Sequence, residues 1–343
     1  MLYFLHVSKC AGSSFIALAR KNLRLFIPNA NGNPINLVTG ERLKFWRWAP
    51  EEQHYFLSSN AWQLVANENQ LGRKVDFFAD VSYVTILREP IDRLFSQWQF
   101  AVEKPRKDES LEERGTKFAH FLQNESGKNW RRNYLLSTLT YQERQDSRRL
   151  DLAKERLEQF DHVFLMDTLA EDIRVLAKHG WTDVDLPWRN TAAPGEASWS
   201  AARAALSGHS DILKRLIETH AEDIELYDYA RAMTQRRKAE PAKIERLPAL
   251  SREIPESDNF EFVIICAYEA HLNGDEVRCR ELLKQAETLP EAGEVNIRKN
   301  RNLTEFALRR FGAPERAEKE HRKMAREKKA ARASATAASR ELT

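Results

Sequence analysis

The chain has 343 residues, of which 42% are hydrophobic and 31% charged, and its formal net charge is +3. This length accommodates one α/β catalytic core of roughly 200 to 250 residues and an appendage, because single hydrophobic cores rarely grow larger. The composition excludes a collagen-like or globally disordered chain, no apolar run reaches the roughly 18 residues of a membrane helix, and the nearly neutral charge gives no reason to expect a nucleic-acid partner.

The cysteines are few and widely separated along the chain. Cys10, Cys266 and Cys279 lack the short paired spacing of a zinc site and are too scattered for a disulfide framework. We therefore expect a reduced, cytoplasmic protein without a signal peptide, a transmembrane segment or a metal cofactor. The sequence makes no prediction of the oligomeric state.

Strands and helices alternate along most of the chain. Apolar runs rich in β-branched or aromatic residues predict strands at residues 2–7, 54–59, 83–87 and 162–167. Helical spacing of apolar residues predicts helices at 13–23 and 91–103, within 117–160, and at 211–233. This alternation predicts a mainly parallel sheet covered by helices on both faces, with ligands bound where strand ends meet helix starts.

The composition changes near residue 237. The residues that follow are charged, contain prolines and have few large apolar side chains, which is typical of a linker. Two further helices joined at 273–275 then predict a helical hairpin. The final segment of Ala, Lys, Arg and Glu predicts a solvated tail, with nucleic-acid binding as the alternative. The predicted division is a catalytic domain at 1–236, a linker at 237–258, a hairpin appendage at 259–312 and a charged tail at 313–343.

The turn after the first strand has the composition of an anion site. A helix that begins directly after a strand presents unpaired backbone N–H groups, which attract anionic oxygens. Gly12 would let a ligand approach the backbone, Ser13 and Ser14 add hydroxyl donors, and Lys9 adds a mobile cation. The lysine precedes the glycine, so this is not a Walker loop. The alternative is a structural turn in which Ser13 caps the helix.

The same turn resembles a known phosphosulfate-binding loop. Residues 4–15 (FLHVSKCAGSSF) are similar to the loop of the carbohydrate sulfotransferases, which typically reads F-x-H-[IV]-x-K-[TC]-[AG]-G-[ST]-[ST]-F. The resemblance implies that Lys9 contacts the oxygens near the scissile bridge of 3′-phosphoadenosine 5′-phosphosulfate (PAPS). It also implies a binding turn for the 5′-phosphate, made of Cys10, Ala11, Gly12, Ser13 and Ser14.

A second segment resembles the family's 3′-phosphate motif. Residues 84–98 (VTILREPIDRLFSQW) are similar to L-R-[DE]-P-x-x-R-x-x-S followed by an aromatic pair, so Arg88 and Ser96 take the two phosphate-contacting roles. A guanidinium at a strand end suits a bidentate phosphate contact, and a serine two helical turns later offers a hydroxyl. Arg93 is expected to be a structural or surface residue. For Arg88 alone, the alternative is a strand-end salt bridge.

The likeness extends to the heparan sulfate 6-O-sulfotransferases and their bacterial relatives. Segments at 129–139, 189–195 and 223–230 resemble later parts of that family, so the likeness spans about residues 2 to 235. It implies a three-layer, P-loop-like α/β fold that uses PAPS as cosubstrate, releases PAP and needs no metal. It also implies that Asn190 and Thr191 lie in a loop over the nucleotide.

The general base is the point at which this chain departs from the family. The 6-O enzymes use a histidine three residues before a tryptophan, and here Ser59 stands at that place before Trp62. His54 is the nearest imidazole, and we predict it as the base. Glu51 and Glu52 are the alternatives, while His6 is expected to position the loop.

The acceptor is predicted to be a hydroxyl of a carbohydrate. Aromatic and basic residues between 42 and 62, among them Trp46 and Trp48, can stack on sugar rings, although both tryptophans suit a core equally well. A phosphoryl transferase would require a Walker lysine and an acidic magnesium ligand, and no such pair is evident. The remaining alternative is a nucleotide-binding scaffold of the same fold without turnover.

Overall fold

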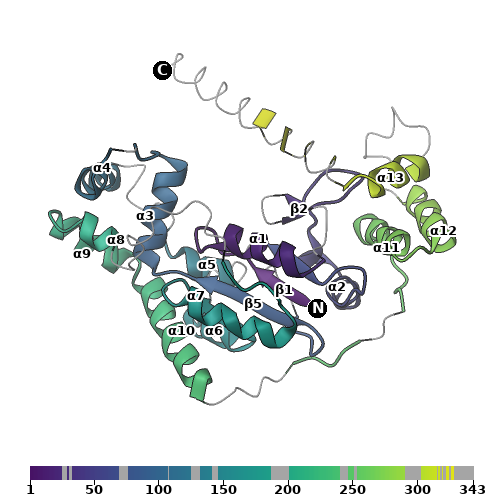
Figure 1. Ribbon diagram of the computed structural model, residues 1–343, viewed down its shortest axis with the longest axis horizontal. Helices are drawn as coiled ribbons and strands as arrows, with labels where there is room; N and C mark the ends of the chain where they lie inside the picture. Colours follow the sequence, from purple (N-terminus) through teal and green to yellow (C-terminus); the bar gives the residue numbers. More distant parts are fainter. Residues whose placement is uncertain are drawn as a thin grey trace. The chain divides into compact units, whose positions relative to one another are not determined.

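The structure is a computed structural model in which the chain forms two compact units (Figure 1). One unit holds Met1, residues 24–66 and residues 249–343, and the other holds residues 2–23 and 67–248. The structure describes the chain except for residues 25–28, 31–32, 69–75, 107, 125–131, 141–145, 187–200, 240–245, 251–252, 290–302, 315, 317–318, 320–321, 324–325 and 328–343. In the part of the chain so described, no helix has both the length and the apolar character needed to cross a membrane.

A parallel sheet forms the centre of the unit at 2–23 and 67–248. Strand β5 (Ser82–Leu87) pairs in parallel with β1 (Leu2–Leu5) on one side and with β6 (His162–Leu165) on the other. The His6 N–H donates to the carbonyl of Asn67, the last residue of β4 (Leu64–Asn67), at 2.8 Å, which completes the order β4-β1-β5-β6. The predicted α/β fold with a central parallel sheet is confirmed, and three of the four predicted strands form.

Helices of this unit cover the sheet in the way that its buried strands require. Helix α1 (Gly12–Asn22) follows β1 and α3 (Pro90–Ala101) follows β5. Helix α10 (Ala221–Ala239) packs against β6 and against the helices at residues 134–139 (α5) and 149–158 (α6), as Figure 1 shows. Further helices of this unit are α5 (Tyr134–Leu139), α6 (Arg149–Glu158), α7 (Leu169–Asp172) and the 3₁₀ segment η2 (Ile173–His179).

An aromatic cluster holds α3 in place. Apolar residues of α3 recur at helical spacing, so Phe95 and Trp98 lie on one face and meet Phe118 at ring centroid distances of 5.2 and 5.1 Å. Figure 1 shows the three other helices of this cluster grouped beside α3. They are α4 (Leu111–Gln123), α8 (Ala201–Ala205) and α9 (Ser210–Thr219).

The predicted strand at 54–59 is wrong, because residues Pro50–Leu57 form helix α2. Pro50 suits the first helical turn, Glu51 and Glu52 favour the positive end of the helix, and the Ala49 N–H donates to Glu52 Oε2 at 3.1 Å. A short apolar run such as HYFL fits a strand or a buried helix equally well. The start signal before the run decides between them.

The helical hairpin shares a core with residues 24–66. Helices α11 (Phe260–Leu272) and α12 (Glu276–Glu287) form the predicted pair, joined at Gly274, whose φ of 77° favours glycine. The Phe262 ring lies 5.7 Å from the Trp48 ring, so the hairpin packs on the earlier segment. The predicted domain division remains a prediction. The other elements of this unit are β2 (Asn29–Ala30), β3 (Asn33–Pro34), η1 (Phe45–Arg47) and α13 (Leu303–Phe311).

Candidate functional site

Charged residues follow the carboxyl ends of all four strands of the sheet. Lys9 lies four residues after β1, Arg88 directly after β5, Glu68 directly after β4, and Asp167 two residues after β6. Because these ends of parallel strands share one edge, the edge carries both cations and carboxylates. Burial and the Arg88 guanidinium lower the pKa of Lys9, and the Glu68 carboxylate opposes them. The two cations therefore act on each other across this edge.

The turn between β1 and α1 is strained in a way that favours anion binding. Lys9 and Ala11 have φ values of 68° and 57°, in the left-handed region that non-glycine residues rarely occupy. Among the described residues no backbone hydrogen bond uses the N–H of Ala11, Gly12 or Ser13, whereas the Ser14 N–H donates to the Ala11 carbonyl at 2.9 Å. Left-handed residues and free N–H groups at a helix start form a concavity for anions.

The N-terminal cap of α1 decides between two readings of the turn that the sequence left open. The structural alternative, in which Ser13 caps α1, is wrong, because Ala11 is the N-cap residue and no side chain caps the helix. Ser13 is exposed and Ser14 is buried. The Ser13 hydroxyl is therefore available to a ligand at the helix start.

Gly12 is required by the ring of His6. A Cβ on Gly12 would lie 1.9 Å from Cδ2 of His6, so the imidazole fills the space that a side chain would take. This packing is a further reason for glycine at this position, and ligand approach to the backbone stays a prediction. The His6 ring stacks on Phe4 at 5.6 Å. Burial and then the nearby Lys9 charge lower the pKa of His6 to about 4, so this imidazole is neutral at pH 7.

Lys9 and Arg88 form no direct ion pair with a carboxylate of the described residues. Within the described part of the chain neither side chain makes an ion pair, and Lys9 Nζ lies 4.1 Å from the centroid of the Phe100 ring. Cys10 is buried, and burial raises the pKa of its thiol to about 11, so Cys10 presents only its backbone. Two neighbouring cations repel each other, so a bound anion would stabilise this pair.

The start of α3 fixes the backbone that carries Arg88. Glu89 caps the helix by accepting the Asp92 N–H at 2.8 Å, and Pro90 occupies the first turn. Asp92 Oδ1 accepts the Ala202 N–H at 2.7 Å, which ties α8 to α3. Ser96 is half-buried on the same helix. Burial raises the pKa of both carboxyl groups, and their hydrogen bonds to the backbone oppose that rise.

Arg93 is a buried structural residue and not a surface one. Its side chain is 2% exposed, and the guanidinium lies 4.2 Å from the centroid of the Tyr134 ring. Asp223 of α10 accepts the N–H groups of Leu135 and Leu136 at 2.9 and 2.7 Å. Burial raises the pKa of Asp223, and the Arg93 charge is among the interactions that lower it. Arg93 therefore helps to stabilise the start of α5.

The predicted base and its neighbours serve the packing of the other unit. His54 is 0% exposed on α2. Ser59 Oγ donates to Glu269 Oε1 at 2.8 Å and accepts the Ala61 N–H at 3.0 Å. Glu52 accepts from Asn259 Nδ2 at 3.0 Å. These side chains link residues 24–66 to α11.

Two predicted residues lie outside the described part of the chain, and the sequence reasoning missed one residue within it. Asn190 and Thr191 belong to the segment 187–200, of which nothing is described. Glu68 was missed, although it directly follows the apolar run 64–67. A carboxylate at a strand end is the signal that would have identified it.

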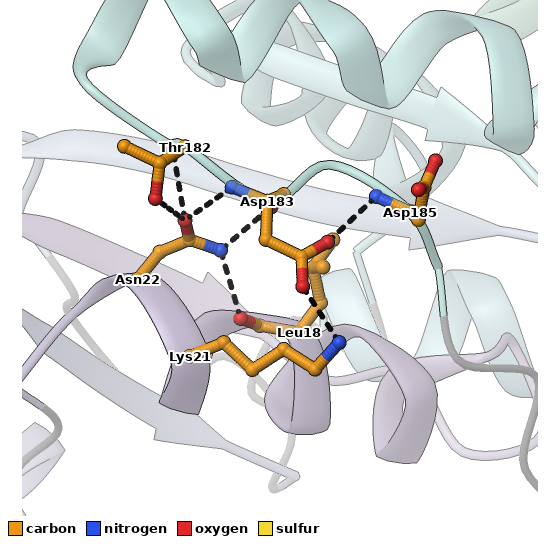
Figure 2. Close-up of polar contacts among 6 residues, drawn as sticks. All are labelled: Leu18, Lys21, Asn22, Thr182, Asp183 and Asp185. Carbon is orange, nitrogen blue, oxygen red and sulfur yellow. Dashed lines mark hydrogen bonds and ion pairs between the residues drawn. The ribbon is translucent and has the colours of Figure 1, made fainter.

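The far end of α1 is anchored by a single asparagine, as Figure 2 shows. Asn22 Oδ1 accepts the N–H groups of Thr182 and Asp183 at 2.8 and 2.9 Å, and Asn22 Nδ2 donates to the carbonyls of Leu18 and Asp183 at 3.0 and 2.7 Å. Lys21 Nζ adds an exposed ion pair to Asp183 at 2.7 Å. Because α1 is held at this end, the direction of its N-terminus is fixed.

Among the described residues, no group of three His, Cys, Asp or Glu side chains lies close enough to hold a metal ion.

Comparisons with known proteins identify the family of the chain. A search of curated proteins found no match. The model of the sulfotransferase family matches residues 1–230, a region that includes both predicted phosphate segments. Since the match covers most of its length, the chain belongs to the sulfotransferase family.

Proposed function

We propose that the protein transfers the sulfuryl group of PAPS to a hydroxyl of a carbohydrate and releases PAP. The observation that carries this proposal is the pair of cations, Lys9 and Arg88, which have no ion-pair partner among the described residues. They lie next to a turn with free N–H groups at a helix start. This arrangement is suited to a ligand that carries several phosphate or sulfate oxygens.

The reaction is an in-line displacement at sulfur. The acceptor oxygen forms a bond to sulfur, the bond between sulfur and the bridging oxygen breaks, and PAP leaves with the electron pair. Lys9 stabilises the charge that grows on the leaving phosphate, and the N–H groups of Ala11, Gly12 and Ser13 hold the 5′-phosphate. Arg88 and Ser96 hold the 3′-phosphate, and the resemblance adds Asn190 and Thr191 over the nucleotide.

The acceptor proton needs a base, for which there are two candidates. Glu68 is half-buried at the end of β4, and its charge acts on Lys9, so its carboxylate lies at the same sheet edge as the proposed leaving group. His54, the prediction from sequence, is fully buried in α2. A base must touch the proton that it removes, so we place Glu68 first and His54 second.

A carbohydrate acceptor rests on the resemblance to the heparan sulfate 6-O-sulfotransferases. Of the two tryptophans that suggested sugar stacking, Trp48 is 7% exposed and belongs to the core of its unit, whereas Trp46 is half-buried. The alternative function is a nucleotide-binding scaffold without turnover, and the burial of His54 favours it. Formation of a sulfated product from labelled PAPS decides between the enzyme and the scaffold.

Calorimetric titration with PAP tests the nucleotide site. Arg88→Ala should weaken PAP binding by roughly 10- to 150-fold, because a charge-assisted contact contributes about 1.5 to 3 kcal/mol. The matched control is Arg148→Ala, which removes a 65% exposed arginine from the same unit and should leave PAP affinity unchanged. Equal PAP affinity in Arg88→Ala and the wild type would refute the assignment of the 3′-phosphate site.

Turnover measurements test the roles in the reaction. Lys9→Ala should lower kcat far more than it weakens PAP binding, as expected of a contact that is strongest in the transition state. Glu68→Gln should lower kcat at constant PAP affinity and remove the limb of the pH profile that depends on carboxylate ionisation. His54→Asn is the comparison variant. If Glu68→Gln keeps a normal rate and His54→Asn does not, the base is His54.

A further inference from the structure

An exposed aromatic ring near the end of α3 is not explained by the packing of that helix. Phe100 is 65% exposed, whereas Phe95 and Trp98 of the same helix are 4% and 2% exposed. Successive helical residues are about 100° apart, so Phe100 lies about 140° round the helix from Phe95 and about 160° from Trp98. The aromatic cluster that buries the other two rings therefore gives no reason for an aromatic residue at position 100.

The exposed ring contacts the lysine that the proposed reaction uses. Lys9 Nζ lies 4.1 Å from the centroid of the Phe100 ring, within the range of a cation–π interaction. Single exposed apolar side chains are common and need no function. This one is distinguished by its contact with the cation of the phosphosulfate turn.

Exposed and charged side chains follow Phe100 closely in the chain. Val102, just after α3, is 50% exposed, and the next residue, Glu103, pairs with Lys117 at 2.6 Å. Lys117 also pairs with Glu109 at 2.6 Å. The chain thus changes from apolar to charged within three residues of Phe100.

We propose that Phe100 is the platform on which the acceptor of the sulfuryl group lies, and that this acceptor is a pyranose whose apolar face stacks on the ring. The proposal rests on the proposed function of the site. In the protein without nucleotide, the ring holds the Lys9 ammonium. A bound phosphosulfate attracts Lys9 more strongly than the ring does, because charge-assisted hydrogen bonds are stronger than an exposed cation–π contact. The ring face is then free beside the reacting sulfur.

The chemistry of the surface favours a sugar over a phenol. One face of a pyranose is made of C–H groups with partial positive charge, which suit the negative face of an aromatic ring, and its edge carries hydroxyl groups. The exposed Phe100 ring meets the first need, and the ion pair of Glu103, three residues later in the chain, with Lys117 supplies charged groups for the second. A phenol would instead require an enclosed apolar pocket to bury both of its faces, and the 65% exposure of Phe100 does not provide one.

Binding measurements on the full chain saturated with PAP test this proposal. The probes are maltohexaose and an unsulfated glucuronate–N-acetylglucosamine hexasaccharide, with p-nitrophenol as the competing class, each followed by saturation-transfer NMR. At least one sugar should bind, and Phe100→Ala should weaken that binding by about tenfold, while Phe100→Trp keeps it. The control is Val277→Ala, which truncates a 72% exposed side chain on α12 and should change nothing.

PAP affinity separates an acceptor platform from a structural role and from failure of the proposed function. Phe100→Ala should leave PAP binding unchanged or tighten it by up to about fivefold, because Lys9 no longer leaves the ring to reach the phosphate. Weaker PAP binding in this variant would mean that Phe100 serves only to position Lys9. Equal sugar binding by wild type and Phe100→Ala, or binding of p-nitrophenol but neither sugar, overturns the proposal. A wild type that fails to bind PAP refutes the proposed function itself.

Discussion

Substitution of Gly12 tests the packing between the sheet and the turn that joins β1 to α1. In Gly12→Ala the new Cβ would lie 1.9 Å from Cδ2 and 2.1 Å from Nε2 of His6. The imidazole is buried and stacked on Phe4, so it has little room to move. Overpacking of this kind destabilises proteins by about 1 to 3 kcal/mol. The variant should therefore lose about that much free energy of unfolding.

In a His6→Ala background, Gly12→Ala should no longer lower the free energy of unfolding. Gly12 is the first residue of α1 and has an ordinary negative φ, so alanine meets no backbone penalty and favours the helix by about 0.5 to 1 kcal/mol. In the His6→Ala background the clash is gone, and Gly12→Ala should be neutral or stabilising. The double-mutant cycle should thus give an interaction energy of about 1 to 4 kcal/mol.

Urea denaturation of the four proteins in this cycle measures the effect. Unfolding midpoints and m-values give the free energy of each variant, and PAP titration reports whether the turn keeps its shape. A Gly12→Ala protein as stable as the wild type, or additive effects in the double variant, would show that the His6 ring does not determine the residue at position 12.

Three further predictions follow from contacts elsewhere. Asn22→Ala should lower the free energy of unfolding by about 1 to 3 kcal/mol, because it leaves backbone N–H groups without acceptors. Lys21→Ala removes only an exposed ion pair and should lower it by less than about 1 kcal/mol. Equal losses for the two variants in urea denaturation would contradict this prediction. His6 has a folded pKa of about 4 against about 6.5 unfolded, so protons bind the unfolded chain first and stability should fall by about 3 kcal/mol between pH 6.5 and 4; an unchanged slope in His6→Phe would refute the assignment. A chain ending near Pro241 should keep PAP affinity but expose residues 24–66 to proteolysis, because it lacks α11; protection of that segment would argue against the shared core.

Local signals in the sequence were sufficient for the strand–turn–helix units that form the candidate site. The runs before Lys9 and Arg88 become β1 and β5, and the helices after them begin where the turn residues and Pro90 indicate. These signals depend on residues within one or two turns of each other, so no distant contact is needed to interpret them. The fold class and both strand–turn–helix units could therefore be predicted, whereas the phosphate-binding roles of these units stay a prediction.

The tertiary structure alone decided how distant segments pack. Residues 24–66 and α11 are about 200 positions apart, yet the Ser59 hydroxyl bonds to Glu269 and the Trp48 ring meets Phe262. The sequence assigned His54 to a strand and left Arg93 between a structural and a surface role. In the structure His54 is buried on helix α2, and Arg93 is buried against the Tyr134 ring. Periodicity shows which face of a helix or strand is buried. Which residues cover that face depends on contacts between segments that are far apart in the chain.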